Sequence, residues 1–482
     1  MRKHLSTGIN GLDVILRDGL IPGRFYLLRG GPGTGKTTLG LHFLIEGLKN
    51  KEEVLLITMT EDIEKIKENG KQYNFPMDEI NYIDLSPGED FISAKKDYDI
   101  FSSAQSEQKP LVEKMTQKIE ELSPDRIFFD GFTQLKYLSS DTYKFRKQIL
   151  SFMQFVKKYD STILLTSEVG ASNPDDDLQF MVDGIINIVY ESQNHYLEIT
   201  KYRGSGFQKG KHSMKFKKDG IEVYPQLEFI KSSYNYESES LSFGVPEIDK
   251  LLNGGIEKGT TTIITGPTGV GKTTLGTQFI KTNGDKDLKS IIYTFEETQK
   301  SLMLRSKSVK INLEQLKNDK KVYIKEISPL EYTPAEFAYE LSRDVQEKGI
   351  SIVLLDSIAG YFLTFNNPDK MQKMITGIHN LCEHLKSLGV TVLMINEQKM
   401  ITGDFQATDT QTSFIADNLI FLRYLEIQGK LEKAIGVLKK RMSGFENTMR
   451  KFEITEEGIK VGKPLENLRG ILSGNPEFLN KK

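Results

Sequence analysis

The chain has 482 residues, of which 38% are hydrophobic and 27% are charged, and this length favours two or three domains over a single hydrophobic core. Its 64 Lys and Arg residues nearly balance its 66 Asp and Glu residues, so the chain as a whole has no strong attraction for nucleic acid, and a nucleic-acid partner is not expected. A single cysteine, Cys382, excludes an internal disulfide and a cysteine-based zinc cluster and suits a reducing compartment.

The chain starts with Met1-Arg-Lys-His-Leu-Ser-Thr-Gly8, which lacks the apolar stretch of a signal peptide. No uncharged apolar run in the sequence is long enough to span a membrane. We therefore expect a cytoplasmic protein without a membrane segment.

Apolar runs with the length of strands alternate with charged, helix-like stretches through both halves of the chain. The predicted strands are 24–29, 54–58, 126–130 and 161–166 in the first half and 260–265, 290–294, 351–356 and 391–396 in the second. Such alternation is typical of a mostly parallel sheet that is covered by helices on both faces. The sequence thus predicts an α/β fold in each half.

A glycine-rich pattern follows the first of these strands in each half, as Gly30-Gly-Pro-Gly-Thr-Gly-Lys-Thr37 and as Gly266-Pro-Thr-Gly-Val-Gly-Lys-Thr273. Both copies fit G-x-x-x-x-G-K-[ST], the phosphate-binding P-loop, whose glycines let backbone N–H groups converge on phosphate oxygens. Each copy precedes a predicted helix, whose N-terminus favours an anion. A chance match is the alternative, but two copies in the same context favour nucleotide binding.

The P-loops supply the predicted nucleotide contacts. Their lysines would place a positive charge on the β- and γ-phosphates, and Thr37 and Thr273 would offer a hydroxyl group to Mg²⁺. The predicted nucleotide-binding residues are Gly31, Gly33, Thr34, Gly35, Lys36, Thr37, Thr38, Thr268, Gly269, Val270, Gly271, Lys272, Thr273 and Thr274.

The two halves are copies of one unit. Lys36 and Lys272 are 236 residues apart, and Glu61 and Glu297 keep the same offset. A repeat of about 230 residues has the size of a complete domain, far above that of a solenoid repeat. The polar, serine-rich stretch 231–240 is interpreted as a linker. We therefore predict an N-terminal domain at 1–230 and a C-terminal domain at 241–482.

Asp130 and Asp356 each end an apolar predicted strand downstream of a P-loop. An acid at this place lies across the sheet end from the P-loop and can hold Mg²⁺ through water. The alternative is an aspartate that caps a helix or stabilises a turn. We predict that these residues bind the metal together with Thr37 and Thr273.

Acidic residues also follow the second predicted strand of each half, with Glu61 in the first half and Glu296 and Glu297 in the second. Carboxylates at the carboxyl end of a strand face the ligand crevice of such a sheet, where one can orient or deprotonate an attacking oxygen. The alternative is acids that stabilise a helix N-terminus. It stays open for Glu61, whereas catalysis is the favoured interpretation of Glu296.

A lysine and an arginine two residues apart end a predicted strand in each half, as Lys201 and Arg203 and as Lys439 and Arg441. Residues i and i+2 of a strand share one face, so each pair would project together. Cations so far along the chain from their own P-loop could reach the γ-phosphate of a neighbouring subunit as fingers. The alternative is a solvated basic edge that prevents strand aggregation.

With these motifs in order, and present twice, the chain resembles a double-domain KaiC-type protein of the RecA/DnaB-like ATPase superfamily. The resemblance covers nearly the whole length and implies two tandem RecA-like domains that form a two-tiered homohexamer, with ATP and Mg²⁺ between neighbouring subunits. It further implies slow ATP hydrolysis in the N-terminal tier and autophosphorylation on Ser or Thr in the C-terminal tier.

Carried over residue by residue, the resemblance makes Glu296 the base for the attacking hydroxyl group, with Glu297 beside it. In the first half Thr60 replaces the leading glutamate, and Glu61 alone remains. The phosphoacceptor of the family matches Ser413, but the adjacent hydroxyl residue is replaced by Phe414. Thr408 retains a nearby threonine of the family.

Two other functions remain open at the level of sequence. One is a recombinase or motor that acts on nucleic acid, because the same scaffold serves several functions; lysine-rich patches at 209–211 and 215–218 favour it and the balanced charge opposes it. The other is a signalling scaffold whose nucleotide state selects an unknown protein partner.

Overall fold

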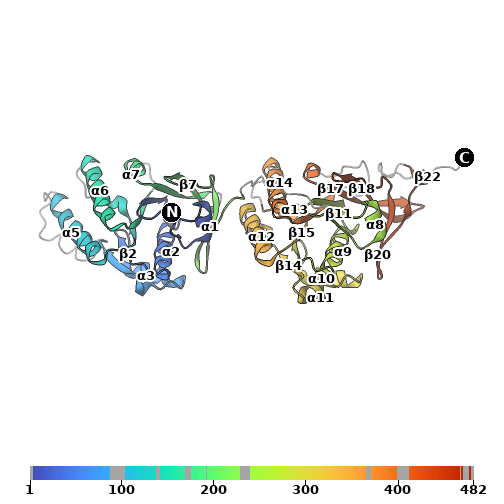
Figure 1. Ribbon diagram of the computed structural model, residues 1–482, viewed down its shortest axis with the longest axis horizontal. Coiled ribbons are helices and arrows are strands. Elements are labelled where there is room, and N and C mark those ends of the chain that lie inside the picture. The colour runs from blue at the N-terminus through green and yellow to red at the C-terminus, as the bar shows by residue number, and fades with distance from the viewer. Residues whose placement is uncertain are drawn as a thin grey trace. The chain divides into compact units, whose positions relative to one another are not determined.

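The computed structural model describes residues 4–86, 104–136, 142–168, 175–191, 193–227, 239–364, 371–398, 412–466, 468–469 and 477–478. The chain divides into two compact units, Met1–Gln226 and Leu227–Lys482. Most of the predicted linker, residues 231–238, lies outside the described residues. Each unit is an α/β domain, as the sequence predicts (Figure 1).

The N-terminal unit is built on one nine-stranded sheet in the order β3-β2-β4-β5-β1-β6-β7-β8-β9. The strands from β3 to β6 in this order pair in parallel, and β7, β8 and β9 continue the sheet in antiparallel pairs. The strands are β1 Phe25–Gly30, β2 Val54–Thr58, β3 Asn81–Asp84, β4 Arg126–Asp130, β5 Thr162–Glu168, β6 Gly184–Glu191, β7 Asn194–Tyr202, β8 His212–Lys217 and β9 Gly220–Tyr224.

Helices cover both faces of this sheet because side chains alternate along the buried strands. In β1, Tyr26 and Leu28 join one apolar cluster, and Leu27 joins the other. The first cluster is completed by α1 Asn10–Ile15, α2 Lys36–Lys49, α3 Ile63–Gln72 and the 3₁₀ turn η1 Met77–Glu79. The second is completed by α5 Ala104–Leu122, η3 Phe132–Lys136, α6 Thr142–Val156, η4 Lys157–Tyr159 and α7 Asp176–Met181.

The C-terminal unit repeats this architecture, with a nine-stranded sheet in the order β14-β13-β15-β16-β12-β17-β18-β19-β20. The strands from β14 to β17 are parallel and the last three are antiparallel. These strands are β12 Thr261–Pro267, β13 Ser290–Thr294, β14 Val322–Glu326, β15 Ile352–Asp356, β16 Thr391–Gln398, β17 Asn418–Ile427, β18 Lys430–Lys440, β19 Arg450–Thr455 and β20 Gly458–Pro464. Two short pairs are added, β10 Ser240–Leu241 with β11 Ile256–Glu257 and β21 Leu468–Arg469 with β22 Glu477–Phe478.

Helices again lie on both faces. One face carries α8 Pro246–Leu251, α9 Lys272–Gly284, α10 Gln299–Ser308 and α11 Leu313–Asn318. The other carries α12 Pro334–Lys348, α13 Ile358–Phe362 and α14 Met371–Ser387. Two 3₁₀ turns complete this unit: η5 Pro329–Glu331 precedes α12, and η6 Thr412–Phe414 precedes β17. The sequence marks the start of α12 clearly, because Thr333 and Glu336 form a capping box around Pro334.

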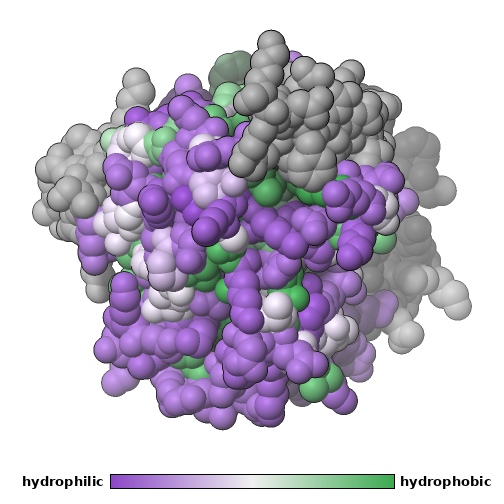
Figure 2. Space-filling view, turned by 90° about the vertical axis from the view of Figure 1, so that its right-hand side faces the viewer, coloured by the Kyte–Doolittle hydropathy of each residue, from purple (hydrophilic) through white to green (hydrophobic). Residues whose placement is uncertain are grey.

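The helices in the described part of the chain give no sign of a membrane segment. No helix there combines the length and the apolar character that a membrane crossing requires. The face of the molecule in Figure 2 is mainly hydrophilic, with apolar side chains confined to small, separate areas.

Candidate functional site

Both P-loops connect a central strand to a long helix. In the N-terminal unit β1 ends at Gly30 and α2 begins at Lys36, and in the C-terminal unit the loop after β12 leads to α9, which begins at Lys272. Gly35 and Gly271, which precede the two helices, have φ angles of +95° and +117°, a region that other residues rarely adopt. The loop therefore turns sharply into the helix, whose first N–H groups are available to a phosphate.

The two P-loop lysines fold back onto their own loops. Lys36 Nζ donates to the carbonyl oxygens of Gly30 and Gly31 at 2.9 and 2.8 Å. Lys272 Nζ donates to the carbonyl oxygen of Pro267 at 2.8 Å. Burial lowers the pKa of both lysines. A bound phosphate would replace the neutral carbonyl oxygens by charged acceptors, which form stronger hydrogen bonds with an ammonium group.

A threonine and an aspartate face each other beside each P-loop. Thr37 Oγ1 donates to Asp130 Oδ2 at 2.7 Å, while Asp130 Oδ1 accepts a second hydrogen bond of 2.7 Å from Thr166. In the C-terminal unit the side chain of Thr273 is hydrogen-bonded to Asp356. Burial raises the pKa of Asp356 to about 6, although the Thr273 hydrogen bond acts in the opposite direction.

These hydroxyl and carboxylate oxygens fit a magnesium ion, which prefers oxygen ligands and keeps several water molecules. Within the described ranges, no group of three or more His, Cys, Asp or Glu side chains is placed to hold a metal. A cation at Thr37 and Asp130, or at Thr273 and Asp356, would therefore take further ligands from water and from the phosphates of a nucleotide.

The acidic side chains after the second central strand differ between the two units. Glu296 Oε1 accepts a hydrogen bond of 2.5 Å from the hydroxyl group of Ser357, which follows β15. Glu297 is bound to α10 instead, because its two oxygens accept hydrogen bonds from Ser301 at 2.7 Å and from Arg305 at 2.5 Å. In the N-terminal unit Glu61 follows β2 and is exposed. Only the C-terminal unit thus presents a leading glutamate that is held by a neighbouring strand end.

Two further glutamates, which the sequence reasoning missed, lie near the P-loops. Glu168 is paired with Gly30 in the register of β1 and β5, and Glu397 is paired with Gly266 in the register of β12 and β16. The negative charges of Glu168 and Glu397 raise the pKa of Lys36 and Lys272, respectively, against the larger effect of burial. The signal in the sequence was an acid near the end of the same predicted strand in each half.

The basic pair of the N-terminal unit lies toward the end of the sheet opposite to the P-loop. Lys201 of β7 is paired with Ile185 of β6, and Ile185 is paired with Leu27 near the start of β1. The P-loop follows Gly30, about 10 Å further along the sheet at the usual rise of a strand. Arg203 comes after β7 and lies still further from that loop.

The C-terminal unit repeats this arrangement. Lys439 of β18 is paired with Leu419 of β17, which is paired with Ile263 near the start of β12, whereas the P-loop follows the other end of β12. The structure therefore does not bring either predicted finger pair to the P-loop of its own unit.

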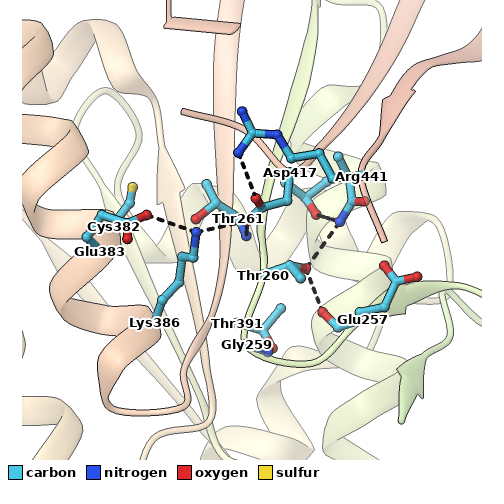
Figure 3. Close-up of polar contacts among 12 residues, drawn as sticks. Glu257, Gly259, Thr260, Thr261, Cys382, Glu383, Lys386, Thr391, Asp417 and Arg441 are labelled. Atoms are coloured by element: carbon cyan, nitrogen blue, oxygen red, sulfur yellow. Dashed lines mark hydrogen bonds and ion pairs between the residues drawn. The ribbon is translucent and has the colours of Figure 1, made fainter. Parts of the chain in front are cut away.

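The basic residues of the C-terminal unit contact the segment before β17. Lys439 Nζ donates to the carbonyl oxygen of Ser413 at 2.9 Å, and Arg441 donates to that of Phe414 at 3.0 Å. Figure 3 shows that the buried carboxylate of Asp417 contacts Arg441 and also Lys386 of α14, at 3.4 and 3.2 Å. The guanidinium group is thus anchored at one side, while about half of its side chain remains exposed.

The predicted phosphoacceptor Ser413 lies in η6 and is half-buried beside this basic pair. In the N-terminal unit Lys201 Nζ makes the equivalent contacts, with the carbonyl oxygens of Gln179 at 2.6 Å and Phe180 at 3.2 Å. The other predicted acceptor, Thr408, lies outside the described residues.

Comparison of the sequence with known protein families finds one family in both halves of the chain. The family model of the KaiC ATPase matches residues 5–228 and again 241–466. The chain belongs to the KaiC ATPase family. It is 26% identical over 489 residues to the circadian clock oscillator protein KaiC of Parasynechococcus marenigrum, covering 98% of this chain and 93% of the relative. It is 25% identical over 493 residues to the circadian clock protein KaiC3 of Synechocystis sp., covering 99% of this chain and 95% of the relative.

The two KaiC domains of this chain share the P-loop and its threonine–aspartate pair but differ at two places. Where the C-terminal domain has Glu296 after its second central strand, the N-terminal domain has Thr60. Where the C-terminal domain has Ser413 beside the basic pair, the N-terminal domain has Gln179. The chemistry of the two KaiC domains should therefore differ although their folds agree.

Proposed function

We propose that this KaiC-family ATPase works as a homohexamer that binds Mg-ATP at both P-loops and transfers a phosphoryl group to Ser413 in its C-terminal tier. The observation that carries the proposal is the sheet register, which places Lys439, Arg441 and Ser413 at the end of the sheet opposite to the P-loop after β12. A phosphate in one P-loop can then meet Lys439 and Arg441 only if another subunit supplies them.

A contact between the P-loop end of one domain and the opposite end of the same domain in a neighbouring subunit is heterologous, and its repetition gives a ring where the rotation closes. The resemblance to two-tiered KaiC hexamers supports six subunits in that ring. In each ring the P-loop of one subunit would face Lys201 and Arg203, or Lys439 and Arg441, of its neighbour. The basic pair would then stabilise the negative charge that develops on the transferred phosphoryl group.

The reaction in the C-terminal tier follows from the positions of its residues. Lys272 binds the β- and γ-phosphates, and Thr273 with Asp356 provides the oxygen ligands for Mg²⁺, which neutralises phosphate charge when it is bound. Glu296 takes the proton of the Ser413 hydroxyl group of the neighbouring subunit. The serine oxygen forms a bond to the γ-phosphorus as the bond to the bridging oxygen breaks, which leaves phosphoserine, ADP and a protonated Glu296. Water in place of Ser413 gives hydrolysis by the same route.

The N-terminal domain is proposed to hydrolyse ATP more slowly. It retains Lys36, Thr37 and Asp130, but Thr60 replaces the leading glutamate and cannot accept a proton. Glu61 is exposed and would have to orient the attacking water alone. Without a hydroxyl group at Gln179, this domain also lacks a phosphoacceptor in the place of Ser413.

The test is to incubate the purified full chain with Mg-ATP and to map phosphate by mass spectrometry, with its mass in solution measured by light scattering. We expect a nucleotide-stabilised hexamer that gains phosphate on Ser413, and a Ser413→Ala variant that gains none at this site but still assembles. If the wild type gains no phosphate and hydrolyses ATP, the kinase half of the proposal is wrong. If the chain stays monomeric with Mg-ATP, the shared site is wrong.

A further inference from the structure

The hydroxyl group of Ser357 is aimed at the leading glutamate of the C-terminal domain. Ser357 Oγ donates to Glu296 Oε1 at 2.5 Å, and the serine itself is 3% exposed. Glu296 lies just after β13 and is exposed, and within the described residues no hydrogen bond is made to its second oxygen, Oε2. One carboxylate oxygen is therefore fixed by the protein while the other is available for chemistry.

The backbone around this contact is tightly packed. Ser357 precedes α13, and its Oγ also accepts a hydrogen bond from Gly360 N at 3.4 Å. A Cβ atom added to Gly360 would lie 2.2 Å from the Cβ atom of Phe295, the residue before Glu296. The backbone at the start of α13 thus packs closely against the side chain of Phe295, next to Glu296. This packing holds the donor and the acceptor at a fixed separation.

The N-terminal domain lacks both members of the pair. Thr60 stands in the place of Glu296, and Gly131, which follows Asp130, stands in the place of Ser357. Gly131 has a φ angle of +80°, and a Cβ atom on it would lie 2.4 Å from the Thr60 methyl group. A serine is therefore excluded there by both its backbone and its neighbour. The glutamate and its serine are exchanged together, as expected if they act as one unit.

We propose that Ser357 is a positioning residue for Glu296, which holds the carboxylate so that Oε2 accepts the proton of the attacking hydroxyl group. This inference rests on the proposed function, in which the γ-phosphoryl group of ATP moves to that oxygen and ADP leaves. A base must lie within hydrogen-bond reach of the proton that it removes. A loosely oriented carboxylate spends less time in that geometry, so loss of the serine should slow the chemical step rather than weaken nucleotide binding.

Three variants test the inference in full-length chains that carry Lys36→Ala, so that ATP turnover reports the C-terminal domain. Ser357→Ala removes both hydrogen bonds of the hydroxyl group. Ser357→Gly installs the residue of the N-terminal domain, and glycine is accepted at the start of a helix nearly as well as serine. Ser357→Thr keeps the hydroxyl group. For Ser357→Ala and Ser357→Gly we expect kcat to fall roughly 10- to 100-fold while KM stays within about twofold of the wild-type value. Ser357→Thr should keep most of the wild-type kcat.

Combination with Glu296→Gln separates positioning from mere stability. If Ser357 acts through the glutamate, Ser357→Gly should add almost nothing to the loss that Glu296→Gln causes alone. Additive losses, or a raised KM with an unchanged kcat, would overturn the inference and leave the proposed function standing. If Glu296→Gln itself changes neither turnover nor Ser413 phosphorylation, the proposed function fails and the inference falls with it.

Discussion

Lys439 Nζ donates a hydrogen bond of 2.9 Å to the carbonyl oxygen of Ser413, so the basic residue and the candidate phosphoacceptor are presented side by side. Both lie at the end of the sheet away from the P-loop of their own domain. A neighbour that docks its nucleotide against this end would meet a cation and a hydroxyl group together. Under the proposed function, the unit of activity is therefore the assembly and not the single chain.

Mixing two inactive variants should restore activity if the site is shared. Lys272→Ala removes the P-loop lysine and Arg441→Ala removes a finger, so each variant alone should lose most phosphorylation of Ser413. In a randomly mixed ring, about a quarter of the interfaces combine an intact P-loop with an intact finger. Phosphorylation by the mixture should therefore approach about a quarter of the wild-type rate, measured with labelled ATP.

The control for this experiment uses the N-terminal tier. Mixing Lys36→Ala with Arg203→Ala should restore ATP turnover by that tier without affecting Ser413. Full phosphorylation by Arg441→Ala alone would show that the finger is dispensable. No recovery in the mixture, after subunit exchange has been verified with differently tagged chains, would contradict a site formed between subunits.

Magnesium-dependent nucleotide binding by the C-terminal domain should depend on pH through Asp356. Burial raises the pKa of this carboxyl group to about 6, so below that pH a proton competes with the metal for the carboxylate. As pH rises from about 5 to 7 the proton is lost, and the affinity for Mg-ATP should increase and then level off. Titration of a fluorescent ATP analogue with the Lys36→Ala chain at several pH values measures this increase.

The Asp356→Asn variant provides the matched comparison. It has no proton to lose near pH 6 and should bind Mg-ATP weakly at every pH in this range. Asp130→Asn alters the N-terminal domain instead and should leave the increase intact. A wild-type affinity that stays flat from pH 5 to 7 while the Asn variant binds equally well would exclude Asp356 as the metal ligand.

The parts of the candidate site that the sequence predicts are local. A P-loop is a run of eight residues whose glycines and lysine act together, and Asp130 and Asp356 are recognisable because each ends an apolar strand. The α/β fold of both halves followed from the same alternation of strands and helices, and the structure confirms it.

Contacts across the sheet could not be predicted, because they depend on strand order. Ser357 meets Glu296 only because β13 and β15 are neighbours, although the two residues are 61 positions apart in the chain. Glu168 lies beside the P-loop for the same reason, through the pairing of β5 with β1. Hydrophobic periodicity identifies a strand but does not say which strand lies next to it.

A methyl group added at Gly40 of α2 should destabilise the N-terminal domain more than the equivalent change at Gly276 of α9 destabilises the C-terminal domain. A Cβ atom on Gly40 would lie 2.1 Å from the ring of Phe128, whereas one on Gly276 of α9 would lie 3.1 Å from a flexible methyl group of Leu354. We expect Gly40→Ala to lower the free energy of unfolding by about 1–3 kcal/mol through overpacking. Gly276→Ala should change it by less than about 1 kcal/mol, because helix propensity offsets the smaller clash.

Calorimetry of the full chain measures both effects, provided that Mg-ATP is absent so that binding does not mask them. Gly40→Ala should lower the unfolding temperature of the N-terminal domain and leave that of the C-terminal domain unchanged. Equal shifts for the two variants would show that the Phe128 ring moves aside without cost.

The stability of the N-terminal domain should fall at mildly acidic pH because of His42. Its Nε2 accepts a hydrogen bond of 2.8 Å from the backbone N–H of Ile221, which requires the neutral ring. Burial lowers the pKa of His42 to about 4, and the charge of Lys49 adds to this effect. Between about pH 6.5 and pH 4, His42 is therefore protonated in the unfolded chain but neutral in the folded domain. The stabilising contribution is complete above about pH 6.5 and is lost as pH falls through about 4, by up to about 3 kcal/mol.

His42→Gln tests this argument with the residue that the other half of the chain uses, because Gln278 occupies the equivalent position of α9. The glutamine side-chain oxygen can accept the hydrogen bond from Ile221 but does not titrate, so the decrease attributed to His42 should disappear. Denaturant unfolding gives the free energy of unfolding of wild type and variant at pH 7 and at pH 5. The carboxylates contribute equally to both chains, so the difference between the two pH-dependent changes is the contribution of His42. An identical loss of stability in both chains between these pH values would show that His42 is not the group responsible.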